Sequence, residues 1–179
     1  PNLLKLKRNG DLNAVKIERL IELLLERSSS ASKTLVFSQF AANLQNIEKR
    51  LGGAVGRIFR LDGSTRNRQE LIDQFQSEPG AAVFLISLKA GGYGLNLTAA
   101  DTVVHLDPWW NPAVEAQATD RAHRIGQTRP VTVYRFLTRD TVEERVRRMQ
   151  DRKRAVIDAA VGDAESGGAP ENWTAAAFR

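Results

Sequence analysis

The sequence predicts an α/β fold in which helices cover both faces of a parallel sheet. Short, continuous apolar runs such as Leu35-Val36-Phe37 are typical of strands that are buried on both sides. Segments with apolar residues at helical spacing alternate with these runs, as in proteins built on a parallel sheet. The chain has 179 residues, of which 42% are hydrophobic and 26% charged, and these values fit one globular domain.

Strands and helices are expected along the whole chain. The expected strands are residues 34–38, 57–61, 82–86, 102–106 and 131–137. The expected helices are residues 12–27, 41–51, 66–76, 112 to about 126, and 141 to about 161. In the last of these, one side carries Val142, Val146, Met149, Val156, Ile157 and Ala160, and the other side is dense in Arg and Lys.

Local signals mark the helix ends. Asp11 can cap the first helix, and Ser64 or Thr65 can cap the helix of residues 66–76. Pro112 suits the first turn of a helix because its missing N–H would be unpaired there. Gly126 is a suitable stop for that helix.

The loops that follow the strands should meet at one edge of the sheet. They begin at Ser38, Asp62, Ser87 and Asp107, each at the carboxyl end of an expected strand. Ligands of parallel sheets bind beyond these ends. We therefore expect the polar motifs of the chain to gather at this edge.

The arginine segment (residues 117–127) reads Gln-Ala-Thr-Asp-Arg-Ala-His-Arg-Ile-Gly-Gln. On a helix, Gln117, Arg121 and Arg124 would share one face because they lie at i, i+4 and i+7. Two guanidinium groups on one face form a rigid fork for a polyanion. A solvated face with salt bridges to Asp120 or Glu115 explains the same spacing equally well.

Two segments imitate parts of a nucleotide site without completing one. Lys33-Thr34 lacks the glycines of a phosphate-binding loop and precedes a strand instead of following it. Asp107 ends an apolar strand, but Pro108 follows it where a second acid would position water. The chain therefore has no phosphate cradle and no magnesium carboxylate of its own.

Other site classes are disfavoured. Gly92-Tyr93-Gly94 follows a strand, but Leu97 stands where a dinucleotide fingerprint needs its third glycine. The chain has no cysteine, and His105 and His123 are not at metal-ligand spacing. No apolar run is long enough for a membrane span, and the first ten residues do not read as a signal peptide. The net charge of +5 is compatible with a polyanionic partner.

Several motifs together resemble a known family. Residues 33–40, 61–65, 87–97, 101–112 and the arginine segment, continuing to about residue 145, resemble in order and spacing the motifs of Swi/Snf-type DNA-dependent ATPases of helicase superfamily two. The resemblance covers roughly two thirds of the chain. It implies a RecA-like parallel sheet, the second of two motor lobes, with a C-terminal brace helix. The first lobe, which carries the Walker motifs, would hold ATP and Mg²⁺.

The resemblance also implies residue roles. Arg121 and Arg124 would be arginine fingers on the γ-phosphate. The expected nucleotide-binding residues are Gln117, Gly92, Gly94, Asn96, Asp120 and Gln127. The expected DNA-binding residues are Ser38, Gln39, Gly63, Ser64, Thr65, Ser87, Lys89, Ala90, Gly91, Trp110 and Asn111. No metal ligand is expected in this chain, and spacing does not say which of Trp109 and Trp110 packs and which meets DNA.

The implied organisation is a linker from the missing lobe (residues 1–10), the motor lobe (11–140), the brace helix (141–162) and a loose tail (163–179). The implied partners are double-stranded DNA, the N-terminal lobe of the same protein and a DNA-bound protein complex, inside the cell and without a membrane. The chain alone would not hydrolyse ATP. The alternative is a stand-alone nucleic-acid-binding module in which the arginine segment clamps phosphates.

Overall fold

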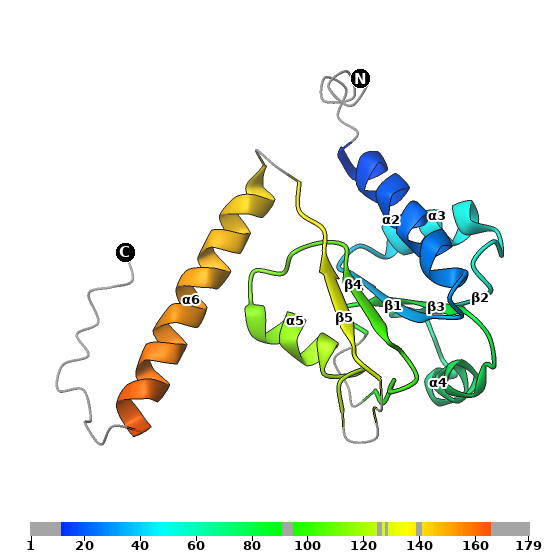
Figure 1. Ribbon diagram of the computed structural model, residues 1–179. Helices are drawn as coiled ribbons and strands as arrows, with labels where there is room; N and C mark the ends of the chain where they lie inside the picture. Colours follow the sequence, from blue (N-terminus) through cyan, green and yellow to red (C-terminus); the bar gives the residue numbers. More distant parts are fainter. Residues whose placement is uncertain (1–11, 91–94, 125–126, 128, 139–140, 166–179) are drawn as a thin grey trace.

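The computed structural model describes residues 12–90, 95–124, 127, 129–138 and 141–165. Its centre is a five-stranded sheet in the order β2-β3-β1-β4-β5 (Figure 1). The strands are β1 (Lys33–Ser38), β2 (Arg57–Leu61), β3 (Ala82–Ser87), β4 (Thr102–His105) and β5 (Thr132–Arg135). Every neighbouring pair is parallel, so the predicted parallel α/β sheet is confirmed.

Helices cover both faces of this sheet. The helices are α2 (Leu12–Ser28), α3 (Ala41–Leu51), α4 (Arg68–Ser77), α5 (Pro112–Thr119) and α6 (Val142–Glu165). Apolar residues of α2 and α3 share one core cluster with Val36 of β1, whereas residues of α4 and α5 share another with Leu35 and Phe37. Successive strand residues point to opposite faces, so one apolar run supplies both cores. This burial on both faces explains why the strands are apolar without alternation.

The predicted cap of α4 is wrong. The helix begins at Arg68, and its N-cap Asn67 makes no side-chain cap hydrogen bond. Ser64 Oγ donates instead to Asp62 Oδ1 at 2.6 Å, and Asp62 N donates to Thr65 Oγ1 at 3.0 Å. Ser64 N also donates to Asp62 Oδ1, at 2.9 Å. The two hydrogen bonds from Ser64, followed by the charge of Arg60, lower the pKa of Asp62 against the effect of burial. The hydroxyl groups of Ser64 and Thr65 are both engaged within the turn that starts at Asp62, so neither of them caps the helix.

The predicted arginine helix is also wrong in extent. α5 ends at Thr119, and Asp120 is its C-cap, so Arg121 and Arg124 lie in turns beyond it. Gln117, Arg121 and Arg124 therefore do not share a helical face. Leu97 N donates to Arg121 O at 2.9 Å, which ties the chain to a distant segment at this point. This bond from a distant segment outweighs the helical spacing of the sequence.

Helix α6 lies beside α5 and leaves much of its length away from the sheet (Figure 1). Lys16 Nζ of α2 donates to Glu143 Oε1 at 2.6 Å, which attaches the first turn. The apolar residues Val142, Met149 and Val156 are 70%, 49% and 57% exposed. The apolar side predicted for this helix is thus largely unburied where the structure describes it. The expected linker (residues 1–10) and most of the expected tail lie outside the described residues.

Candidate nucleotide and nucleic-acid interface

Strand register brings the predicted loops together at the carboxyl edge of the sheet. Ser38 pairs with Ser87, and Phe37 pairs with His105. Leu61, which precedes Asp62, pairs with Ile86. The loops that begin after these strands therefore start side by side, as predicted for this edge. Among their residues, Gly63, Ser64, Lys89 and Trp110 are exposed.

Ser38 is fully buried and bonds within the protein. Its Oγ donates to Asp107 Oδ2, and Phe40 N donates to Ser38 Oγ at 3.1 Å. Burial raises the pKa of Asp107, against the hydrogen bond from Ser38 and the charge of Lys16. Lys16 Nζ also donates to Leu106 O at 3.0 Å. The hydroxyl of Ser38 thus joins two loops of the edge and is turned away from a ligand at the surface.

The two tryptophans of the 107–111 loop have different positions. Trp109 is half-buried against the core, and its backbone N–H donates to Glu115 Oε1 at 2.8 Å. Trp110 is 55% exposed, and Lys153 Nζ lies 4.8 Å from the centre of its ring. Asn111 Oδ1 accepts from Ala113 N at 3.1 Å and so caps α5. Trp110 is therefore the tryptophan that a ligand at this edge can reach.

Glu115 is a buried junction that the sequence analysis did not identify. It is 1% exposed, and Gln150 Nε2 of α6 donates to its Oε1 at 2.8 Å. Arg135 Nε of β5 donates to its Oε2 at 3.3 Å. Glu115 and the buried Ala118 are three positions apart on α5 and therefore face the core together, whereas the sequence analysis considered Glu115 only as a salt-bridge partner on a solvated face. It connects α5, β5, α6 and the 107–111 loop.

The arginine segment lies elsewhere, against residues 95–101, here named the return segment because it leads back to the start of β4. Asp101 N donates to Lys33 O at 3.1 Å, so this segment reaches the amino end of β1. Gln127 Nε2 donates to Thr98 O at 2.9 Å and to Ala100 O at 2.7 Å. The expectation that all motifs share the carboxyl edge is therefore wrong for the arginine segment. Helix α5 starts near that edge and carries its own carboxyl end back toward the amino ends of the strands.

An open hollow of about 920 Å³ lies beside the arginine segment. Its lining residues are Asn96, Asp120, His123, Arg124 and Gln127. Three residues predicted to bind nucleotide, Asn96, Asp120 and Gln127, thus meet Arg124 at one surface. Gln117 is exposed on α5. Gly91, Gly92 and Gly94 lie outside the described residues.

The two arginines have different surroundings. Arg121 is 6% exposed, whereas Arg124 is exposed on the hollow. Within the described part of the chain, Arg121 Nε is buried without a hydrogen-bond partner. Burial lowers the pKa of Arg121, and the positive charge of Arg124 lowers it further against the opposing charge of Asp120. A buried cationic nitrogen without an acceptor is costly. Arg121 is not among the described residues that line the hollow, whereas its neighbour Arg124 is.

Residues 15–126 match the family described as helicase conserved C-terminal domain. This chain belongs to that family. Chromatin-remodeling ATPase INO80 of Emericella nidulans is 43% identical over 159 residues, which are 88% of this chain and 10% of that protein. An uncharacterized ATP-dependent helicase of Schizosaccharomyces pombe is 44% identical over 154 residues, 84% of this chain and 15% of the relative.

The similarity extends to a solved structure. The crystal structure of the C-terminal part of the Fun30 ATPase domain has a TM-score of 0.70 and 39% identity to this chain, covering 75% of this chain and 45% of that one. The chain is the C-terminal, RecA-like helicase lobe of a Swi/Snf-type protein of superfamily two, as the resemblance of its motifs predicted. It spans about a tenth of the length of the first curated relatives.

The described residues contain no group of three or more acidic or histidine side chains placed to hold a metal ion. In the part of the chain that the structure describes, each helix is too short or too polar to cross a lipid bilayer.

Proposed function

We propose that this helicase C-terminal lobe is the second motor lobe of an ATP-driven double-stranded DNA translocase. Arg121 and Arg124 act as arginine fingers on ATP that is held, with Mg²⁺, by the N-terminal lobe of the same protein. The observation that carries the proposal is the buried Nε of Arg121, which has no hydrogen-bond partner among the described residues, close to the exposed charge of Arg124. Two neighbouring cations beside an open hollow favour an anion such as the γ-phosphate.

Asn96 and Asp120 belong to the proposed nucleotide side of the hollow. They line it together with Arg124 and present polar groups from the return segment and from the end of α5. Gln117, Gly92 and Gly94 complete the proposed set on the nucleotide side. The chain lacks the Walker motifs, so we expect it to hydrolyse no ATP without the N-terminal lobe.

We place the DNA at the carboxyl edge of the sheet. Lys89 supplies a charge there, Trp110 supplies an aromatic surface, and Gly63 and Ser64 form an exposed turn. Such groups hold a sugar-phosphate backbone without reading its bases. Gln39, Thr65, Ala90, Gly91 and Asn111 belong to the same loops, whereas Ser38 and Ser87, both buried, support them from beneath.

Closing and opening of the two lobes would move this edge along one DNA strand. Residues 1–10 would link the lobes, residues 11–140 would form the moving lobe, and residues 141–162 would brace it against the N-terminal lobe. The names of the INO80 relatives describe chromatin-remodeling ATPases, so chromatin or another DNA-bound protein complex is the proposed substrate, and the nucleus the proposed location in a eukaryotic cell.

The test uses the full-length protein with DNA. Arg121→Ala or Arg124→Ala should reduce DNA-stimulated ATP turnover by about 10³-fold or more, since arginine fingers contribute on that scale. The dissociation constant for DNA should stay within two-fold. Arg19→Ala is the control, because Arg19 is exposed on α2 and pairs with Glu22. Unchanged turnover in both variants would refute the assignment of Arg121 and Arg124 as arginine fingers.

The alternative is a stand-alone nucleic-acid-binding module, which the net charge of +5 favours. In that case the arginine segment holds phosphates of the nucleic acid directly. Arg121→Ala and Arg124→Ala would then weaken DNA binding, and the salt dependence would fall by about one unit of slope for each residue. A titration of DNA at several salt concentrations separates the two functions.

A further inference from the structure

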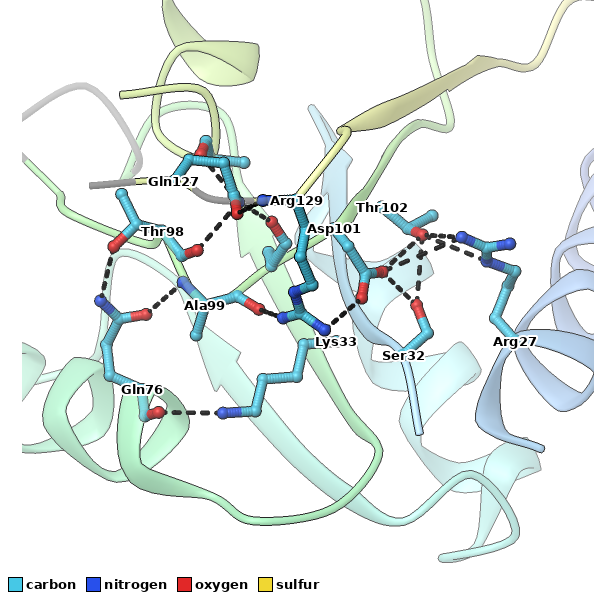
Figure 2. A network of polar contacts seen from close by, with 12 residues as sticks. Arg27, Ser32, Lys33, Gln76, Thr98, Ala99, Asp101, Thr102, Gln127 and Arg129 are labelled. Carbon is cyan, nitrogen blue, oxygen red and sulfur yellow. Dashed lines mark hydrogen bonds and ion pairs between the residues drawn. The ribbon is translucent and has the colours of Figure 1, made fainter. Parts of the chain in front are cut away.

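On one side of the return segment, backbone carbonyl groups accept hydrogen bonds from side chains. Gln127 Nε2 donates to Thr98 O and Ala100 O, and Arg129 Nη2 donates to Ala99 O at 2.7 Å (Figure 2). Arg129 Nη1 also pairs with Asp101 Oδ2 at 3.0 Å. Two side chains that follow the arginines in sequence therefore hold residues 98–101, which lead into β4.

Gln76 of α4 holds the same stretch through different atoms. Ala99 N donates to Gln76 Oε1 at 2.8 Å, and Gln76 Nε2 donates to Thr98 Oγ1 at 3.3 Å. Gln76 is itself held, because Lys33 Nζ donates to Gln76 O at 2.9 Å (Figure 2). The return segment is thus fixed between the end of α4 and the arginine segment.

The side chain of Gln127 has little capacity left for a ligand. An amide nitrogen carries two hydrogens, and Nε2 already faces three carbonyl oxygens, including Ala122 O at 3.3 Å. Arg129 N donates to Gln127 Oε1 at 2.9 Å. Gln127 lines the hollow, but its polar atoms are engaged with the backbone. Direct binding of nucleotide by Gln127, as expected from the sequence, would require breaking these bonds.

We propose that Gln76, Gln127 and Arg129 form a positioning clamp on the return segment. The clamp fixes the arginine segment relative to the return segment and to the end of α4. This inference rests on the proposed function, because it assigns these residues a role in aligning Arg121 and Arg124. Misplacement of a catalytic group by about 1 Å can cost about 100-fold in rate, so a residue that touches no nucleotide can still control turnover.

Gln76 distinguishes a clamp from a nucleotide ligand. It comes from α4, and it is absent from the described lining of the hollow. If Gln127 acted only as a nucleotide ligand, the substitution of Gln76 would have no effect on catalysis. The clamp predicts that loss of Gln76 has the same kinetic signature as loss of Gln127 or Arg129.

The experiment measures steady-state ATP turnover of the full-length protein at saturating DNA. Gln76→Ala, Gln127→Ala and Arg129→Ala should each lower kcat by about 10- to 100-fold, with KM for ATP within two-fold. Gln76→Glu should restore kcat, because its carboxylate still accepts from Ala99 N and can accept from the Thr98 hydroxyl. Gln74→Ala is the control on the same helix, since Gln74 bonds Arg57 and Glu70 instead.

Normal kcat in both Gln76→Ala and Arg129→Ala would overturn the clamp, and so would a raised KM with unchanged kcat in Gln127→Ala. Arg129 is half-exposed, so its variant should fold even if Gln76→Ala does not. Circular dichroism and melting of each variant check folding. If Arg124→Ala abolishes turnover while the clamp variants do not, only the clamp fails. If Arg124→Ala has no effect, the proposed function fails.

Discussion

Gln150→Met should loosen α6 from the rest of the lobe. Gln150 is fully buried, and its Nε2 donates to Glu115 Oε1 at 2.8 Å and to Trp109 O. Met has nearly the same length and volume, so the substitution removes hydrogen bonds without opening a cavity. A neutral hydrogen bond contributes about 1 kcal/mol, and one to a charged group about 1.5–3 kcal/mol. We therefore expect the free energy of unfolding to fall by about 2.5–4 kcal/mol.

Urea unfolding of the 179-residue chain measures this loss. For a chain of this size the melting temperature should fall by about 5–15 °C. Hydrogen exchange should also become faster in the first half of α6. The matched control is Met149→Gln, the reverse exchange at the neighbouring position, where the side chain is 49% exposed and the change should stay within about 0.5 kcal/mol. A loss below about 0.5 kcal/mol in Gln150→Met would refute the reasoning.

Two further predictions concern pH and backbone conformation. Burial lowers the pKa of His105 to about 4, despite the opposing charge of Glu115, so between pH 6.5 and 4 the unfolded chain binds a proton that the folded chain does not. Between pH 7.5 and 4.5, the free energy of unfolding of the wild type should therefore fall by about 2–3 kcal/mol more than that of His105→Gln. Urea unfolding at both pH values measures this difference. Gly56 has φ +84°, and a Cβ would lie 2.1 Å from Ala81 O. Gly56→Ala should lower the free energy of unfolding by more than about 3 kcal/mol. Gly53→Ala, at φ +87° in open space, should lower it by only about 1–2 kcal/mol. Equal losses in the two variants would exclude the clash as the cause.

The strands and most helices could be predicted because their signals are local. The middle of β1, residues 35–37, is buried on both faces of the sheet and is apolar throughout, and such a run is visible without any contact partner. The spacing of apolar residues likewise gave the bounds of α3. The parallel orientation of the strands then followed from the alternation of strands and helices.

The candidate site was only partly predictable. The residue types and their order indicated the family, but the helical face proposed for Arg121 and Arg124 was wrong. The end of α5 depends on bonds such as Leu97 N to Arg121 O, which joins residues far apart in the sequence. Sequence spacing also could not distinguish Trp109 from Trp110, since both stand in one loop and only packing against the core separates them.

The amino-acid sequence by itself determined a parallel sheet with polar loops at its carboxyl edge, and the order of its motifs indicated the family. Only the tertiary structure decided that the arginines lie beside the return segment, away from that edge. It also decided that Glu115 joins four elements and that Gln76 bonds to a segment more than twenty residues away. The reason is physical: patterning reports how much of a residue is buried, whereas the partner of a buried polar group depends on which distant atoms the fold brings within hydrogen-bond reach.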